Sequence, residues 1–173
     1  MEYIIIWSRI RSLVLALLVV FSVIGQHEAA AKVVEGDMFP DLSNFEFDGE
    51  VPEIEGKVVL VDFWASWCAP CKASFPAMER FYQEFKDRGF EIIAVSVDDS
   101  ASAYARFAKS SGATFPILRD LGKKLVATCA IEAMPTSFML DKSGRVHAVH
   151  QGYSGKKTDE QYRKEILALL AED

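Results

Sequence analysis

The chain has 173 residues, of which half are hydrophobic and a quarter charged, and its formal net charge is −6. This length and composition are typical of a folded domain with a core and exclude a disordered chain, and the negative charge gives no reason to expect nucleic acid among its partners. Only three cysteines are present, at positions 68, 71 and 129, too few for a fold held together by disulfides.

The first 31 residues differ in composition from the rest. Two arginines precede an apolar run at residues 12–25, and a small-residue stretch follows at residues 29–31. A positive flank, a short apolar run and a small-residue site are the features of a secretory signal peptide. We therefore predict a signal peptide over residues 1–31 and one domain over residues 32–173. The alternative is that residues 1–31 stay attached as a membrane anchor, because further apolar residues precede the arginines.

From residue 32 the pattern changes to alternating strands and helices. Residues 44–54 predict an N-terminal β-hairpin around a turn at Asp48-Gly49. The elements expected after it are, in chain order, a buried strand at 58–65, a helix from Cys71 to Gly89, a buried strand at 90–99, a helix at 100–112, a short strand at 114–118, a short helix at 121–131, a hairpin of strands at 136–141 and 145–152, and an amphipathic helix at 158–173. This order predicts an α/β fold whose parallel sheet becomes mixed where the hairpin joins it.

The stretch WCAPC places two cysteines between a buried strand and a helix. Cys68 follows the strand, and Cys71 lies in the first turn of the helix. Free N–H groups and the positive end of the helix dipole stabilise a thiolate there, so we expect a lowered pKa for Cys68 and a nucleophilic role. Cys71, one turn further in, would resolve the mixed disulfide. Pro70 suits a first helical turn and restricts the loop.

Two other interpretations of the cysteine pair are weaker. A bridge that closes so short a loop constrains the unfolded chain little, so it would stabilise the fold little. A zinc site needs two more ligands. His27 lies in the predicted signal peptide, and His147 and His150 point to opposite faces of a strand. We therefore expect no metal and no cofactor.

The residues VDFWASWCAPCK resemble the active site of the thioredoxin superfamily, and Met134-Pro135-Thr136 resembles its cis-proline segment. With the export signal, residues 36–171 resemble the TlpA/ResA-like branch of exported thiol–disulfide oxidoreductases. The resemblance implies a thioredoxin fold, a mixed central sheet flanked by helices, with an N-terminal β-hairpin and a helix-strand insert at about residues 100–118.

The resemblance also implies roles for single residues. Trp67 would pack beside the thiols and shape a docking surface, and a cis Pro135 would place its neighbours against Cys68. Met134 would offer backbone groups to a substrate strand, with Thr136 in the same segment. Gly152 matches a glycine that lines the same groove.

The implied activity is exchange with disulfide-containing or dithiol proteins in the periplasm or another extracytoplasmic space. We favour the protein as reductant, with electrons from a membrane thiol-transferring partner, in processes that include cytochrome c maturation. The alternative is the oxidation of client thiols, which uses the same residues, because the direction depends on the reduction potential relative to that of the compartment. In many such relatives a glutamate linked to that client stands three residues after the second cysteine, where this chain has Ser74.

Asp62 lies inside a strand that we expect to be buried. A buried carboxylate has a raised pKa and can carry a proton to or from the resolving thiol. The thioredoxin family has an aspartate at this position, and the lysine that partners it in thioredoxin is replaced here by Ala94. The alternative is an aspartate at a strand edge that is bonded to water.

Other classes of function use the same residues. Two thiolates with the sulfur of Met134 would suit Cu(I), so a thioredoxin-like copper chaperone is one alternative. A peroxiredoxin-like peroxidase is another, although the Pro-x-x-x-Thr-x-x-Cys setting of that family is missing. Cys129 is expected to be a half-buried free thiol, with a third redox partner as the alternative, and Trp64 suits the core and the site equally.

Overall fold

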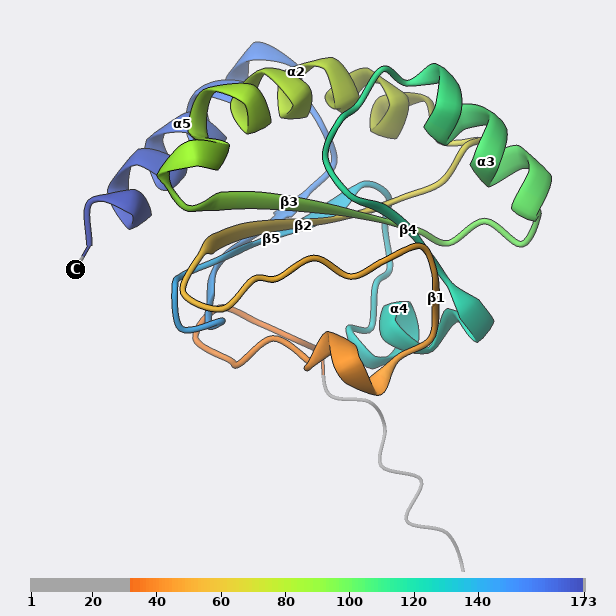
Figure 1. The fold of residues 1–173 in the computed structure, drawn as a ribbon, viewed down its shortest axis with the longest axis horizontal. Coiled ribbons are helices and arrows are strands. Elements are labelled where there is room, and N and C mark those ends of the chain that lie inside the picture. The colour runs from red at the N-terminus through yellow and green to blue at the C-terminus, as the bar shows by residue number, and fades with distance from the viewer. Residues whose placement is uncertain (1–31, 173) are drawn as a thin grey trace, which may run out of the picture.

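The computed structural model describes residues 32–172; the predicted signal peptide or anchor at residues 1–31 lies outside them. The described part of the chain forms a six-stranded mixed sheet in the order β1-β4-β3-β2-β5-β6 (Figure 1). Strands β2, β3 and β4 are parallel, and β1, β5 and β6 are each antiparallel to their neighbours. The strands are β1 (Phe47–Asp48), β2 (Val58–Trp64), β3 (Phe90–Ser96), β4 (Ile117–Asp120), β5 (Thr136–Leu140) and β6 (Val146–Gln151). The mixed α/β sheet predicted from the order of the elements is confirmed.

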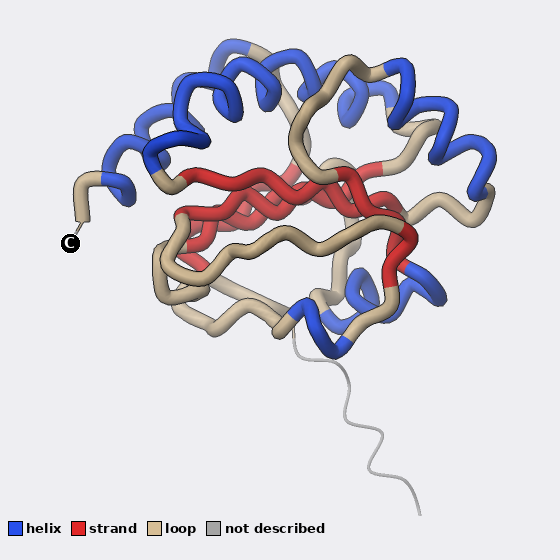
Figure 2. The backbone as a smooth tube through the Cα atoms, viewed as in Figure 1, coloured by secondary structure: helices blue, strands red, loops and turns tan. Residues whose placement is uncertain are grey.

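Helices cover both faces of this sheet. One face carries α2 (Ala69–Phe85), α3 (Ala101–Ser110) and α5 (Lys156–Leu170), and the other carries α4 (Lys124–Thr128) with the N-terminal segment (Figures 1 and 2). Short 3-10 turns lie at Leu42–Asn44, Lys86–Arg88 and Leu121–Lys123. Among the described residues, no helix is long and apolar enough to span a membrane.

The two central strands, β2 and β3, place the sheet between two layers of helices and loops. Every residue of β2 and of β3 is buried, as expected for parallel strands that are covered on both faces. Trp64 is fully buried and packs against Phe75 of α2 and Phe107 of α3. Its side chain therefore belongs to the core and does not line the site.

The predicted N-terminal hairpin is wrong in its pairing. Only Phe47 and Asp48 form a strand in that segment, and they pair with β4 rather than with residues 51–54. Pro52 has no N–H to donate, so it cannot take part in a regular ladder there. The insert is confirmed as α3 followed by β4, but its strand begins at Ile117 rather than at residue 114. Pro116 has no N–H to donate to a ladder, although its carbonyl accepts the N–H of Ala94 in β3.

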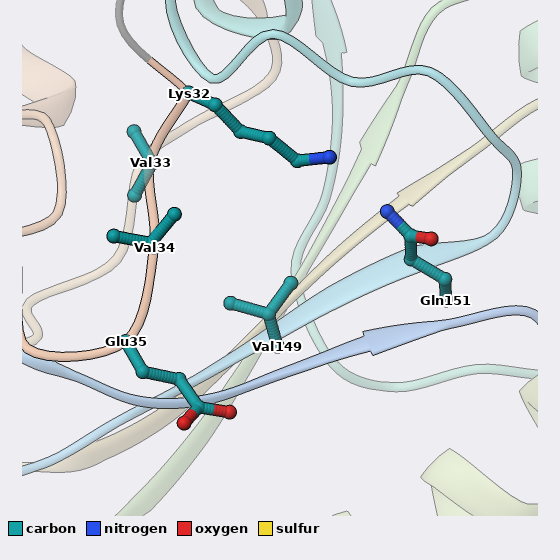
Figure 3. Close-up of a pocket in the computed structure, with 6 residues that line it drawn as sticks. All are labelled: Lys32, Val33, Val34, Glu35, Val149 and Gln151. Carbon is teal, nitrogen blue, oxygen red and sulfur yellow. The ribbon is translucent and has the colours of Figure 1, made fainter.

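A groove on the surface runs between the first described residues and the edge strand β6. It is lined by Lys32, Val33, Val34, Glu35, Val149 and Gln151 (Figure 3). None of the predicted site residues lines it, so the cysteine pair does not belong to this groove.

Candidate functional site: the cysteine pair and its surroundings

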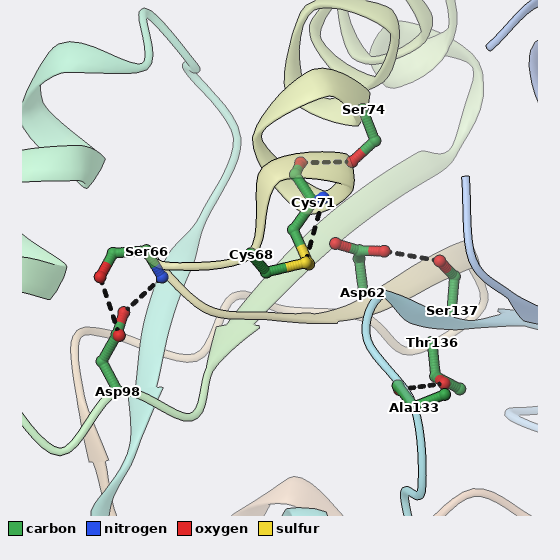
Figure 4. The surroundings of a disulfide bond; sticks show 9 residues. All are labelled: Asp62, Ser66, Cys68, Cys71, Ser74, Asp98, Ala133, Thr136 and Ser137. Atoms are coloured by element: carbon green, nitrogen blue, oxygen red, sulfur yellow. Dashed lines mark hydrogen bonds between the residues drawn. A yellow bond between two sulfur atoms is a disulfide. The ribbon is translucent and has the colours of Figure 1, made fainter. Parts of the chain in front are cut away.

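The cysteine pair lies where β2 passes into α2, and the two residues form a disulfide (Figure 4). Cys68 is the N-cap of α2, and its Sγ accepts the backbone N–H of Cys71 at 3.2 Å. Pro70 lies in the first helical turn, where no hydrogen bond is lost by the missing N–H. This arrangement directs the helix N-terminus at the sulfur of Cys68, the geometry expected to stabilise a thiolate after reduction.

The loop before Cys68 is held by a carboxylate that the sequence did not single out. Asp98, just after β3, is 5 % exposed. It accepts the backbone N–H of Ser66 at 2.9 Å and the hydroxyls of Ser66 and Ser96, each also at 2.9 Å. The two donors of Ser66 thus tie the end of β3 to the loop after β2, and the Ser96 hydroxyl holds the Asp98 carboxylate from its own strand. An acidic residue directly after a buried strand, beside a loop serine, is the signal that would have found it.

The Met134–Pro135 turn lies at the same end of the sheet as the disulfide. The register places Thr136 of β5 opposite Phe63 of β2, so the turn continues past the end of β2. The peptide bond between Met134 and Pro135 is cis. The buried Thr136 hydroxyl donates to the carbonyl of Ala133 at 2.7 Å, which closes the turn from inside.

Gly152 connects this turn to β6. Its N–H donates to the carbonyl of Pro135 at 2.8 Å, and its φ of 79° lies in the left-handed region that glycine adopts without strain. Gly152 and the Met134–Pro135 turn, which the resemblance places in one groove, are therefore neighbours in space.

Asp62 lies on β2 between the disulfide and β5 (Figure 4). Its side chain is 1 % exposed, which rules out the strand-edge alternative. Burial raises the pKa of Asp62 to about 7, although a hydrogen bond from Ser137 acts in the opposite direction. Register also places Ala94 opposite Asp62, where thioredoxin has its lysine.

One of the two carboxylate oxygens of Asp62 has a hydrogen-bond partner, and the other has none among the described residues. The Ser137 hydroxyl donates to Oδ1 at 2.5 Å, while Oδ2 is buried without any partner in the structure. The sequence could not show this contact, because 75 positions separate the two residues. A buried carboxyl with one free oxygen beside two sulfurs can accept or release a proton there.

Three further residues differ in how far they reach solvent. Trp67 is 71 % exposed, the most exposed of the large hydrophobic side chains in the described residues. Ser74 is buried and donates to the carbonyl of Cys71 at 2.7 Å, so the position of the relatives' glutamate carries no charge here. Cys129 is 1 % exposed, more buried than expected, and burial with the nearby charge of Asp120 raises its thiol pKa to about 12.

Comparisons with known proteins agree with this geometry. The family model described as Redoxin matches residues 35–166. The chain belongs to the Redoxin family. A thiol-disulfide oxidoreductase ResA of Bacillus thuringiensis is 37% identical over 117 residues, covering 68% of each chain. The ResA of Oceanobacillus iheyensis is 33% identical over 148 residues, covering 81% of this chain and 77% of its own.

Solved structures confirm the thioredoxin fold of this Redoxin domain. A Chlorobium tepidum chain assigned as a thiol:disulfide interchange protein, DsbE, superposes with a TM-score of 0.74 at 32% identity over 81% of this chain and all of that one. StoA from Bacillus subtilis gives a TM-score of 0.57 at 28% identity, covering 64% of this chain and 83% of its own. Together the relatives confirm a ResA-like protein thiol–disulfide oxidoreductase.

Proposed function

We propose that this Redoxin domain reduces disulfides of client proteins outside the cytoplasm, with Cys68 as nucleophile and Cys71 as resolving thiol. The observation that carries the proposal is the Cys68–Cys71 disulfide at the N-terminus of α2, with the Sγ of Cys68 facing an N–H donor. A thiolate at that position is stabilised by the helix end, and only a thiolate attacks a disulfide.

The Cys68 thiolate of the reduced protein attacks one sulfur of the client disulfide, and the other client sulfur leaves as a thiolate that takes up a proton. Cys71 passes its proton to Asp62, and the resulting thiolate attacks the Sγ of Cys68. The Cys68–Cys71 disulfide forms, and the second client sulfur leaves and is protonated. Two electrons pass from the protein to the client.

The free oxygen of Asp62 supports its part in the second step. Oδ2 has no partner and lies in the buried space beside the disulfide, so a proton bound there competes with no existing hydrogen bond. Because burial raises the pKa of Asp62 to about 7, its carboxyl exchanges protons near neutral pH.

A client would bind on the surface beside the pair. The exposed Trp67 supplies an aromatic contact, and the backbone of Met134 pairs with an extended client segment next to Pro135 and Gly152. The buried Thr136 supports this surface from inside through its bond to Ala133.

The reducing direction and the location are also part of the proposal. A buried carboxylate beside the pair disfavours thiolate charge in the reduced form, and a less stable reduced form gives a more reducing couple. Export by residues 1–31, as signal peptide or anchor, would require a membrane thiol-transferring donor to return electrons. The resemblance implies a role in cytochrome c maturation. The glutamate linked to that client is replaced here by the uncharged Ser74, so whether apocytochrome c is a client has to be tested directly.

Trapping tests the assignment of the two cysteines. A Cys71→Ala variant should accumulate a mixed disulfide on Cys68 that is released by dithiothreitol, and mass spectrometry of a periplasmic extract identifies the client. The matched Cys129→Ala variant should trap nothing, because Cys71 is still present to release the client. Full disulfide-exchange activity in Cys68→Ser would overturn the assignment, and a reduction potential above that of the extracytoplasmic thiol pool would overturn the direction.

A further inference from the structure

We propose that Ser137 and Tyr162 are positioning residues for Asp62: their hydroxyls form a hydrogen-bond chain that orients the carboxylate and leaves its second oxygen free for the proton of Cys71. The inference rests on the proposed role of Asp62. It adds two residues, from β5 and α5, that neither the motif nor the resemblance identifies.

The chain is continuous and buried. The Ser137 hydroxyl lies 2.5 Å from Oδ1 of Asp62 and 2.8 Å from the hydroxyl of Tyr162. Ser137 is 1 % exposed and Tyr162 is 2 % exposed. Water cannot easily replace either partner, so each contact has to be made by the protein itself.

The direction of the chain follows from proton counting. Ser137 has one proton, and ionised Asp62 can only accept, so Ser137 donates to Asp62 and must accept from Tyr162. Burial and the charge of Asp62 raise the pKa of Tyr162 well above its usual range, so this phenol keeps its proton. Each donor polarises the next, which strengthens the bond to the carboxylate.

This polarity predicts what the chain does to the charge of Asp62. A hydrogen bond to the charged form favours that form, so Ser137 opposes the effect of burial on the pKa of Asp62. Without the chain, burial would leave a larger fraction of Asp62 protonated at neutral pH, and that fraction could not accept the proton of Cys71. The two hydroxyls therefore keep a desolvated carboxyl usable as a base.

The remaining groups around this chain are few. Opposite Asp62 on β3 is the neutral Ala94, and His150 of β6 packs edge-on against Tyr162 while pairing with Glu165 at 2.7 Å. The groups that face the chain from the packed elements are Cys68 at the N-cap of α2, Cys71 of α2, Tyr162 and Glu165 of α5, His150 of β6 and Tyr153 of the loop before α5. None of these supplies Oδ1 with a second donor in the described structure.

The test is a titration that needs no client. The protein is labelled with ¹³C at aspartate carboxyls, kept oxidised, and titrated by NMR, with the Asp62 signal assigned from Asp62→Asn. Ser137→Ala should raise the pKa of Asp62 by about one pH unit, because a bond to a charged group is worth at least that much. Tyr162→Phe should raise it by a smaller amount, and Ser137→Thr, which keeps a hydroxyl, should restore most of the wild-type value.

Tyr104→Phe is the matched control. This tyrosine is also buried, and its hydroxyl donates to the Ile117 carbonyl at 2.8 Å, away from Asp62. It should lower stability without moving the Asp62 titration, which separates loss of structure from loss of the chain. If Ser137→Ala does not fold, the comparison of Tyr162→Phe with Tyr104→Phe tests the inference: only Tyr162→Phe should raise the pKa of Asp62.

Kinetics supply the second readout. The rate of the resolving step is measured against pH in single-turnover reduction of a model protein disulfide. In each variant, the midpoint of this pH–rate profile should move to higher pH by as much as the Asp62 titration moves. An Asp62 titration unchanged in both Ser137→Ala and Tyr162→Phe, or moved to lower pH, would overturn the inference. Failure of the proposed function would show differently, as exchange that persists in Cys68→Ser, and would leave the titration result unaffected.

Discussion

Two buried aspartates, Asp62 and Asp98, flank the disulfide loop, and they differ in how many hydrogen bonds their carboxylates accept. Asp98 accepts three hydrogen bonds, from the backbone of Ser66 and from two serine hydroxyls. Asp62 accepts one, and its second oxygen has no partner. The same side chain is therefore fully hydrogen-bonded beside Ser66 and only half hydrogen-bonded beside the disulfide, where the proposed function uses it for proton exchange. Variants of the two aspartates and of Ser66 test this contrast.

The largest effect is expected on stability from Asp62→Asn at pH 8. Unfolded Asp62 ionises near 3.8 and folded Asp62 near 7, so the unfolded state loses its proton first as pH rises. The free energy of unfolding therefore falls between these values and levels off above about 7. The asparagine variant lacks that fall and should be more stable by up to about 4 kcal/mol at pH 8. Urea titrations of both proteins at pH 5 and pH 8 measure it; a gap that does not widen with pH contradicts the raised pKa.

Asp98→Ala should act in the opposite direction. It leaves the Ser66 N–H and the buried Ser96 hydroxyl without an acceptor, which should lower the free energy of unfolding by about 3 kcal/mol. Chemical denaturation measures it, and a loss below about 1 kcal/mol would mean that the loop is held by other contacts.

The third effect is on rate and should separate the two residues kinetically. Asp62→Asn should slow the release of client from the mixed disulfide by about ten- to a hundredfold at pH 7, because Cys71 loses its proton acceptor. Attack by Cys68, the earlier step, should change less. Stopped-flow measurement of both phases checks this, and equal slowing of the two steps would remove Asp62 from the resolving step.

Ser66→Ala should give the smallest effect. It removes one hydroxyl bond to Asp98 but leaves the backbone N–H bond in place, so stability should fall by about 1 kcal/mol. The release rate should equal that of the wild type within twofold. A release defect as large as that of Asp62→Asn would show that the Asp98 side of the loop also takes part in proton transfer.

The two aspartates also show which features of the site local sequence patterns can predict. Local patterns predicted the elements, the position of Cys68 at a helix N-terminus, and the burial of Asp62, because each depends on neighbours in the chain. They missed the partners Ser137 and Tyr162, which approach Asp62 only when β5 and α5 pack against β2. The N-terminal hairpin was also mispredicted because its pairing depends on a distant segment: Phe47 and Asp48 pair with β4.

The most direct test of the account is the titration of Asp62 in the wild-type, oxidised protein. The ¹³C signal of its carboxyl, assigned with Asp62→Asn, is followed from pH 3 to pH 9. We expect a midpoint at about 7, because burial raises the pKa of this carboxyl. A midpoint near 4, the value of an ordinary exposed aspartate, would contradict the claim that a desolvated carboxyl with one free oxygen exchanges protons with the cysteine pair.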